Sequence, residues 1–298
     1  MYFWLDKIPL LGIFGLTIVI VLLSIWIGAF LGNRKRRQSD HEDESSLSSI
    51  IGATLGLLAF MLAFTFGIAA ERYQTRKQLL LNEVNAIGTT YLRAQLLLEP
   101  HRSEVQTLLR EYVDRRVNLA KETPLSQLEA FKDILSHSEA LQNQLWSHAV
   151  ALAEADRSSE IDALFIGSLN EMIDFHHSRI TVLQYRIPTL IWYVLLFITI
   201  LSMATVGYQA GLSGQSSIKM GVVLALTFSS VIFLITDLDR ITGTLRVNQQ
   251  PMFDLQERMQ TPMQETGYQK VFPDSKEKIF KEAAIDSAEA YFAGFHST

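Results

Sequence analysis

The chain has 298 residues, a formal net charge of −5 and 48% hydrophobic residues. The hydrophobic residues are gathered into four long windows, a distribution that excludes an ordinary soluble globular protein. The chain contains no cysteine, which excludes disulfide bonds, thiolate zinc sites and cysteine nucleophiles.

Four windows free of Asp, Glu, Lys, Arg and His predict four transmembrane helices. They lie at residues 8–31, 47–70, 187–207 and 220–236 and are 24, 24, 21 and 17 residues long. A bilayer core about 30 Å thick takes roughly 17–25 helical residues, and a charge at the centre of a span would cost about 2.5–3.5 kcal/mol. The first window ends in a basic run, Arg34-Lys35-Arg36-Arg37, rather than in a small-residue cleavage site, so we expect a span and not a signal peptide.

Residues 34–44, between the first two windows, form a charged block for which we expect a short polar loop. Its basic run is short and lies next to lipid, so attraction to anionic head groups explains it more simply than nucleic-acid binding. The bilayer is therefore an expected partner, and nucleic acid is not.

A polar insert of 115 residues, 72–186, separates the second and third windows. It has only two prolines, Pro100 and Pro124, and two glycines, and this scarcity of helix breakers favours helix throughout. Breaks at the two prolines and near Ser158-Ser159 predict helices over about residues 72–98, 101–121, 125–155 and 159–186. The first should continue the second span without interruption, with a helical hairpin packed between or beside it and the last.

The remaining segments complete an all-α prediction. Residues 208–219, rich in Gly and Ser, are expected to be a plain connector, and an amphipathic piece after Pro251 precedes a polar tail. The expected divisions are residues 1–71 with the first two spans, 72–186 as a helical extramembrane domain, 187–240 with the last two spans, and 241–298 as a C-terminal segment.

Four spans place both termini and the helical domain on one side of the membrane. Eight basic residues lie near span ends on that side and five in the short loops, which favours a cytoplasmic helical domain. The basic run at residues 34–37 favours the opposite orientation, with the helical domain on the other side of the membrane. We expect a multi-pass protein of the cell (inner) membrane.

Small residues recur along the second span at steps of three and four. They are Gly52, Gly56, Ala59, Ala63, Gly67 and Ala70, and these steps place them on one helix face. Small residues let helix backbones approach closely in lipid. The face therefore packs against other helices of its own subunit or around an axis in a homo-oligomer, and the sequence leaves both interpretations open.

A polar stripe continues that face into the insert: Glu71, Gln74, Gln78, Asn82, Asn85 and Thr89. A solvated helix face explains it, but amides and hydroxyls also suit the wet, weakly charged vestibule of an ion pathway. Phe60 and Phe64, one turn apart in the span, are candidates for an apolar constriction or are ordinary core aromatics. The candidate pore-lining residues are Phe60, Phe64, Glu71, Arg72, Gln78, Asn82 and Asn85.

No phosphate-binding loop, nucleophile elbow or catalytic triad pattern is present, so we expect no enzymatic activity. Glu171, Asp174, His176 and His177 cluster before the third span, but adjacent residues point about 100° apart on a helix. We therefore expect ordinary helix-surface residues there rather than a metal site.

The junction after the fourth span gathers charge, amides and two punctuating residues in Asp237, Asp239, Arg240, Gly243, Arg246, Gln249, Gln250 and Pro251. Asp237 and Arg240, three apart, can pair on one helix face, which leaves Asp239 free. Asp237 and Asp239 offer hard oxygen ligands, but Ca²⁺ takes six to eight and would need another segment. A helix stop with interfacial anchoring is the simpler interpretation.

These junction residues resemble the signature of the bacterial bestrophin-like domain family, whose proline after Asp-Leu-Asp-Arg is replaced here by Ile241. The blocks Glu83-Val84-Asn85-Ala86, Tyr91-Leu92-Arg93, Glu99-Pro100 and Arg110-Glu111-Tyr112 resemble the family's other recurring region. The resemblance extends to about Gln260.

Bestrophins are pentameric anion channels, and the resemblance implies a similar assembly for this chain. The second span would line a pore, the insert would form a cytosolic assembly of a homo-oligomer such as a pentamer, and Asp237 and Asp239 would lie near a Ca²⁺-sensing position, with no other cofactor. We therefore expect an oligomeric ion channel, and alternatively a non-conducting scaffold or sensor whose helical domain binds a partner.

Overall fold

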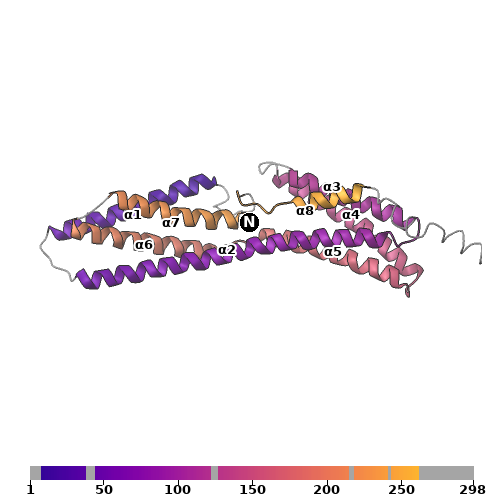
Figure 1. Cartoon of the computed structure of the whole chain (residues 1–298), viewed down its shortest axis with the longest axis horizontal. Coiled ribbons are helices and arrows are strands. Elements are labelled where there is room, and N and C mark those ends of the chain that lie inside the picture. The colour runs from indigo at the N-terminus through magenta and orange to yellow at the C-terminus, as the bar shows by residue number, and fades with distance from the viewer. Residues whose placement is uncertain (1–7, 38–43, 122–126, 215–217, 241–242, 262–298) are drawn as a thin grey trace, which may run out of the picture. The chain divides into compact units, whose positions relative to one another are not determined.

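The computed structural model describes residues 8–37, 44–121, 127–214, 218–240 and 243–261, and in these ranges every regular element is a helix (Figure 1). The chain divides into two units, Met1–Gln256 and Glu257–Thr298, and of the second only residues 257–261 are described. The helices are α1 (Leu10–Arg36), α2 (Glu44–Ala94), α3 (His101–Lys121), α4 (Gln127–Ala155), α5 (Glu160–Gln184), α6 (Thr189–Ser213), α7 (Ile218–Asp239) and α8 (Gln250–Gln260).

The four predicted spans are confirmed as helices long and apolar enough to cross a membrane. They are α1, the first part of α2, α6 and α7, and they pack as α1 on α6 and α7 and as α2 on α6 and α7. Figure 1 shows α1, α6 and α7 alongside the half of α2 that contains its apolar window. The buried hydrophobic residues between them are Leu, Ile, Val, Ala and Met, together with the aromatic Trp192.

The closest helix packing in the membrane part joins α1 and α6. A side chain added at Gly28 would overlap the carbonyl group of Ala204, and one at Gly207 would overlap that of Ile25. Gly32 and Gly211 make the same kind of contact one turn further along each helix. These two Gly-xxx-Gly pairs are visible in the sequence, and they, rather than the glycines of the second span, form the tight contact within the chain.

Helix α2 has 51 residues and runs without a break from the membrane part into the helical domain, as predicted. Its second part packs against α3 and α5, and α4 packs against α3 and α5 (Figure 1). The largest side chains with almost no exposure in this bundle are Tyr112 and Phe165, with Leu80, Ile87, Leu97, Leu109, Leu145, Leu169 and Met172 around them. The two long helices and the helical hairpin expected from the sequence are therefore present.

Helix ends follow local sequence signals in most places. Ser159 caps α5, because its hydroxyl oxygen accepts the backbone N–H of Asp162 at 3.2 Å. Helix α6 extends to Ser213, so the first half of the expected connector at residues 208–219 is helical instead. The predicted break at Pro124 and most of the loop at residues 34–44 lie outside the described residues.

Candidate functional site

The small-residue face of α2 is uncovered in the single chain. Nothing lies within 4 Å of a side chain added at Gly52, Gly56 or Gly67, and Ala59 and Ala63 are exposed. Packing of these glycines inside one subunit is therefore wrong, because the other three spans cover a different side of α2. The alternative, a contact around an axis between copies, stays a prediction.

Phe60 and Phe64 lie on this same open face. Their side chains are 64% and 54% exposed, and the two rings stack with centroids 6.4 Å apart and planes inclined by 14°. Ordinary core aromatics would be covered by neighbouring helices, and these two are not. A role as a constriction stays a prediction, since it requires other copies of the chain.

The polar stripe continues along the open face into the helical domain. Glu71, Gln78 and Asn85 are exposed, Asn82 is half-buried, and Gln78 donates to the Asn82 side chain at 2.9 Å. Arg72 leaves the stripe, because successive residues are rotated by about 100° around a helix. Its side chain is half-buried and its charge acts on Asp239, so the pore-lining role of Arg72 stays a prediction.

A buried ionic network in the helical domain was missed by the sequence analysis. Glu83 on α2 has no exposed side-chain surface and pairs with Arg116 on α3 at 2.9 Å and with Arg179 on α5. Tyr112 donates to the same carboxylate at 3.2 Å. A visible signal exists, because Glu83 falls on the helix face that also carries Leu80, Val84 and Ile87.

The electrostatics of this network follow from its burial. Burial alone would raise the pKa of Glu83, but the guanidinium groups of Arg116 and Arg179 outweigh it and hold that pKa well below the usual value. Burial lowers the pKa of His176, whose Nδ1 lies 2.8 Å from the Tyr112 hydroxyl. Glu83 is therefore a carboxylate and His176 a neutral imidazole at neutral pH, and His176 serves the core rather than a helix surface.

The junction after α7 is a folded turn closed by Asp237. Its carboxylate accepts the backbone N–H groups of Thr244 at 2.5 Å and Leu245 at 3.1 Å. A side chain at Gly243 would overlap this carboxylate, so only glycine lets the chain return so closely. Asp237 is 2% exposed and acts as the acceptor that holds the returning segment.

Asp239 is not the free carboxylate expected from the sequence. It is buried, accepts the backbone N–H of Ile187 at 3.1 Å, and the positive charges of Arg186, Arg72 and Arg76 act on it. Asp239 thus joins the end of α7 to the start of α6. Among the described residues no group of three or more acidic or histidine side chains could hold a metal ion, and the implied Ca²⁺ site stays a prediction.

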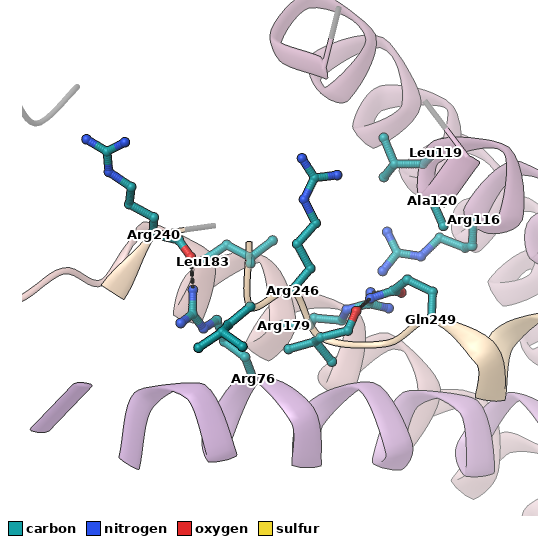
Figure 2. A pocket seen from close by; sticks show the side chains of 11 residues that line it. Arg76, Arg116, Leu119, Ala120, Arg179, Leu183, Arg240, Arg246 and Gln249 are labelled. Atoms are coloured by element: carbon teal, nitrogen blue, oxygen red, sulfur yellow. Dashed lines mark hydrogen bonds between the residues drawn. The ribbon is translucent and has the colours of Figure 1, made fainter. Parts of the chain in front are cut away.

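Several arginines tie the junction to its neighbours. Arg76 on α2 donates to the carbonyl groups of Arg240, at 3.1 Å, and Leu238. Arg240 donates to the Ile8 carbonyl at 2.8 Å, before α1. Gln249 accepts from Arg179 at 2.8 Å (Figure 2). Arg179 in turn pairs with Glu83, which connects the junction to the buried network.

The remaining junction residues begin α8 and line a pocket. Asn248 accepts the backbone N–H of Gln250 at 2.9 Å, and Pro251 follows in the first turn of α8, where its missing N–H costs nothing. Arg246 is exposed and donates to the Gly243 carbonyl at 3.3 Å. It lines a pocket with Arg76, Arg116, Arg179 and Arg240 (Figure 2).

The two sequence regions that carried the resemblance therefore meet in space. Glu83 and Tyr112 come from one region and Gln249 from the other, and Arg179, which neither region includes, joins them. The sequence alone does not reveal this contact, because more than 130 positions lie between Tyr112 and Gln249.

Comparison with known proteins gives a consistent result. The family model of the bestrophin-like domain matches residues 15–252. A solved membrane protein has a TM-score of 0.60 at 15% identity and covers 83% of this chain and 97% of its own. A single-substitution variant of a bacterial bestrophin homologue from Klebsiella pneumoniae has a TM-score of 0.60 at 14% identity, covering 82% of this chain and 96% of its own. Another variant of that homologue has a TM-score of 0.60 at 16% identity, covering 84% of this chain and 95% of its own. At these identities the likeness concerns the fold alone, and no curated protein matches.

Proposed function

The chain belongs to the bestrophin-like domain family, and we propose that it forms an oligomeric ion channel with α2 lining the pathway. The observation that carries the proposal is the uncovered face of α2. At three of its glycines, an added side chain would meet no atom of another helix within 4 Å, although the same chain uses other glycines for tight helix packing. A face that only met lipid would have no need of small residues, whereas a face that approaches other helices does.

The chemistry along this face suits an ion pathway. The exposed pair Phe60 and Phe64 supplies an apolar constriction inside the span, and hydrophobic constrictions gate by excluding water. Glu71 follows at the end of the apolar window, and Gln78 and Asn85 offer amides beyond it. Arg72 and Asn82, both half-buried, contribute less to the lining.

The proposal is tested by mass and by current. Purified protein in detergent should have the mass of four or more copies, with five expected, and should carry ionic current in planar bilayers. Phe64→Ala should change that current. Phe197→Ala is the matched control, because Phe197 on α6 is 63% exposed but lies on another helix. No current at any salt or voltage, or equal effects of the two variants, would count against an α2-lined pore.

The alternative is a non-conducting scaffold or sensor whose helical domain binds a partner. It is favoured by one observation, the lack of a charged side chain in any of the four apolar windows, since charged rings are a common source of ion selectivity. A monomer or dimer in detergent would support this alternative and exclude a pore around an axis.

A further inference from the structure

A small cavity lies between α2, α3, α5 and the returning segment after α7, just outside the apolar windows. Its volume is about 180 Å³, and five of its eleven lining residues are arginines: Arg76, Arg116, Arg179, Arg240 and Arg246. The other lining residues are Gln249 and the apolar Leu119, Ala120, Leu183, Leu245 and Val247. No Asp or Glu is among these described lining residues, so the wall is strongly positive.

The charge around the cavity is only partly balanced. Glu83, behind the wall, is the carboxylate that pairs with both Arg116 and Arg179. Arg76 and Arg246 donate to backbone carbonyl groups, which carry no net charge. The guanidinium of Arg240 points away from the other labelled arginines and donates to Ile8 (Figure 2). Four guanidinium groups thus surround the cavity, and two buried carboxylates act on three of them, Glu83 on Arg116 and Arg179 and Asp239 on Arg76.

Among the described residues of this wall, the buried donors without a hydrogen-bond partner include two that belong to arginines of α2 and α3. These two are the Nε groups of Arg116 and Arg76. Arg116 is 6% exposed, and Figure 2 shows it reaching from α3 toward Arg179 and Gln249. An unsatisfied buried donor is costly, and more so when it belongs to a charged group. Both arginines line the cavity, so an acceptor bound there would lie next to their guanidinium groups.

We propose that this cavity binds the phosphate group of an anionic ligand. Arginine forks match the oxygens of phosphate and carboxylate, but phosphate offers more acceptor oxygens and can receive several guanidinium groups together. The cavity is smaller than the 300–1,000 Å³ typical of drug-sized sites, which fits one phosphate group better than a whole cofactor.

The phosphate has two available sources, a lipid head group and a soluble phosphate. Arg76 lies six residues beyond the end of the apolar window at residue 70, which is about 9 Å along the helix axis, so the cavity is within reach of head groups. The apolar part of the lining also suits a ligand that carries a hydrocarbon portion. Basic pockets next to spans bind anionic head groups in this way.

The test measures thermal stability of the full-length protein, because a ligand that binds only the folded state raises its unfolding temperature. Inorganic phosphate is compared with sodium chloride at equal ionic strength, and phosphatidylglycerol vesicles with phosphatidylcholine vesicles. Stabilisation by inorganic phosphate identifies a soluble ligand, and stabilisation by phosphatidylglycerol alone identifies a head group. Arg246→Gln should raise the apparent Kd about tenfold or more, since a charge-assisted hydrogen bond is worth about 1.5–3 kcal/mol.

Arg115→Gln is the matched control. Like Arg246→Gln, it removes one positive charge. Arg115 lies on α3, is exposed, pairs with Glu111 at 3.3 Å and is not among the residues that line the cavity. Its apparent Kd should equal that of the unaltered protein. The inference is overturned if neither phosphate probe stabilises the protein beyond its reference, or if both variants weaken binding equally. Because the readout involves no current and no oligomer mass, its outcome is independent of the channel proposal.

Discussion

Glu83→Gln is expected to destabilise the helical domain by about 3–5 kcal/mol, the cost of removing one partner of a buried ion pair. Glutamine keeps about the same side-chain volume, but it removes the charge and replaces one acceptor oxygen by an NH2 donor. The carboxylate has no exposed surface, pairs with Arg116 at 2.9 Å and with Arg179, and accepts from Tyr112 at 3.2 Å. Its loss leaves two guanidinium groups buried or half-buried without their counter-charge.

The assay is thermal unfolding of the full-length protein in detergent, followed by circular dichroism. Glu111→Gln is the matched control, because Glu111 forms an exposed pair with Arg115 four residues away, worth about 0.3–0.5 kcal/mol. The double variant Glu83→Gln with Arg179→Gln should recover part of the loss, since it removes one of the unbalanced charges. A loss for Glu83→Gln no larger than that for Glu111→Gln would refute the reasoning.

Three further predictions concern the same elements. The pKa of Glu83 is low in the folded state, so the stabilisation by its carboxylate is complete above the unfolded pKa of about 4.3 and is lost as the pH falls through the folded pKa. The difference in free energy of unfolding between the unaltered protein and Glu83→Gln should therefore shrink from pH 7 to pH 3. Gly207→Leu should lower the yield of folded protein because its side chain would overlap α1, whereas Gly56→Leu should leave folding intact and reduce the oligomer mass in detergent. Asp237→Asn keeps one acceptor oxygen for two backbone amides and should cost about 1–3 kcal/mol in thermal unfolding; an unchanged melting temperature would contradict the capping role.

The junction illustrates how far sequence reasoning reached in the candidate site. The residues from Asp237 to Pro251 are singled out by their composition and their family resemblance, but their roles depend on partners far along the chain. Asp239 bonds to the backbone of Ile187, and Gln249 bonds to Arg179. No local pattern specifies such partners, so the free carboxylate expected at Asp239 is replaced by a buried one.

The amino-acid sequence by itself determined the elements of this protein. Charge-free windows determine the spans, because the cost of a charge in lipid is set residue by residue. Prolines and capping residues determine where helices begin and end, as Ser159 does at the start of α5. Only the tertiary structure decided which helix faces are covered. Whether Gly56 or Gly207 forms a tight contact, and whether Glu83 is solvated or buried, depends on which helix lies opposite, since burial is a property of packed neighbours and not of the residue itself.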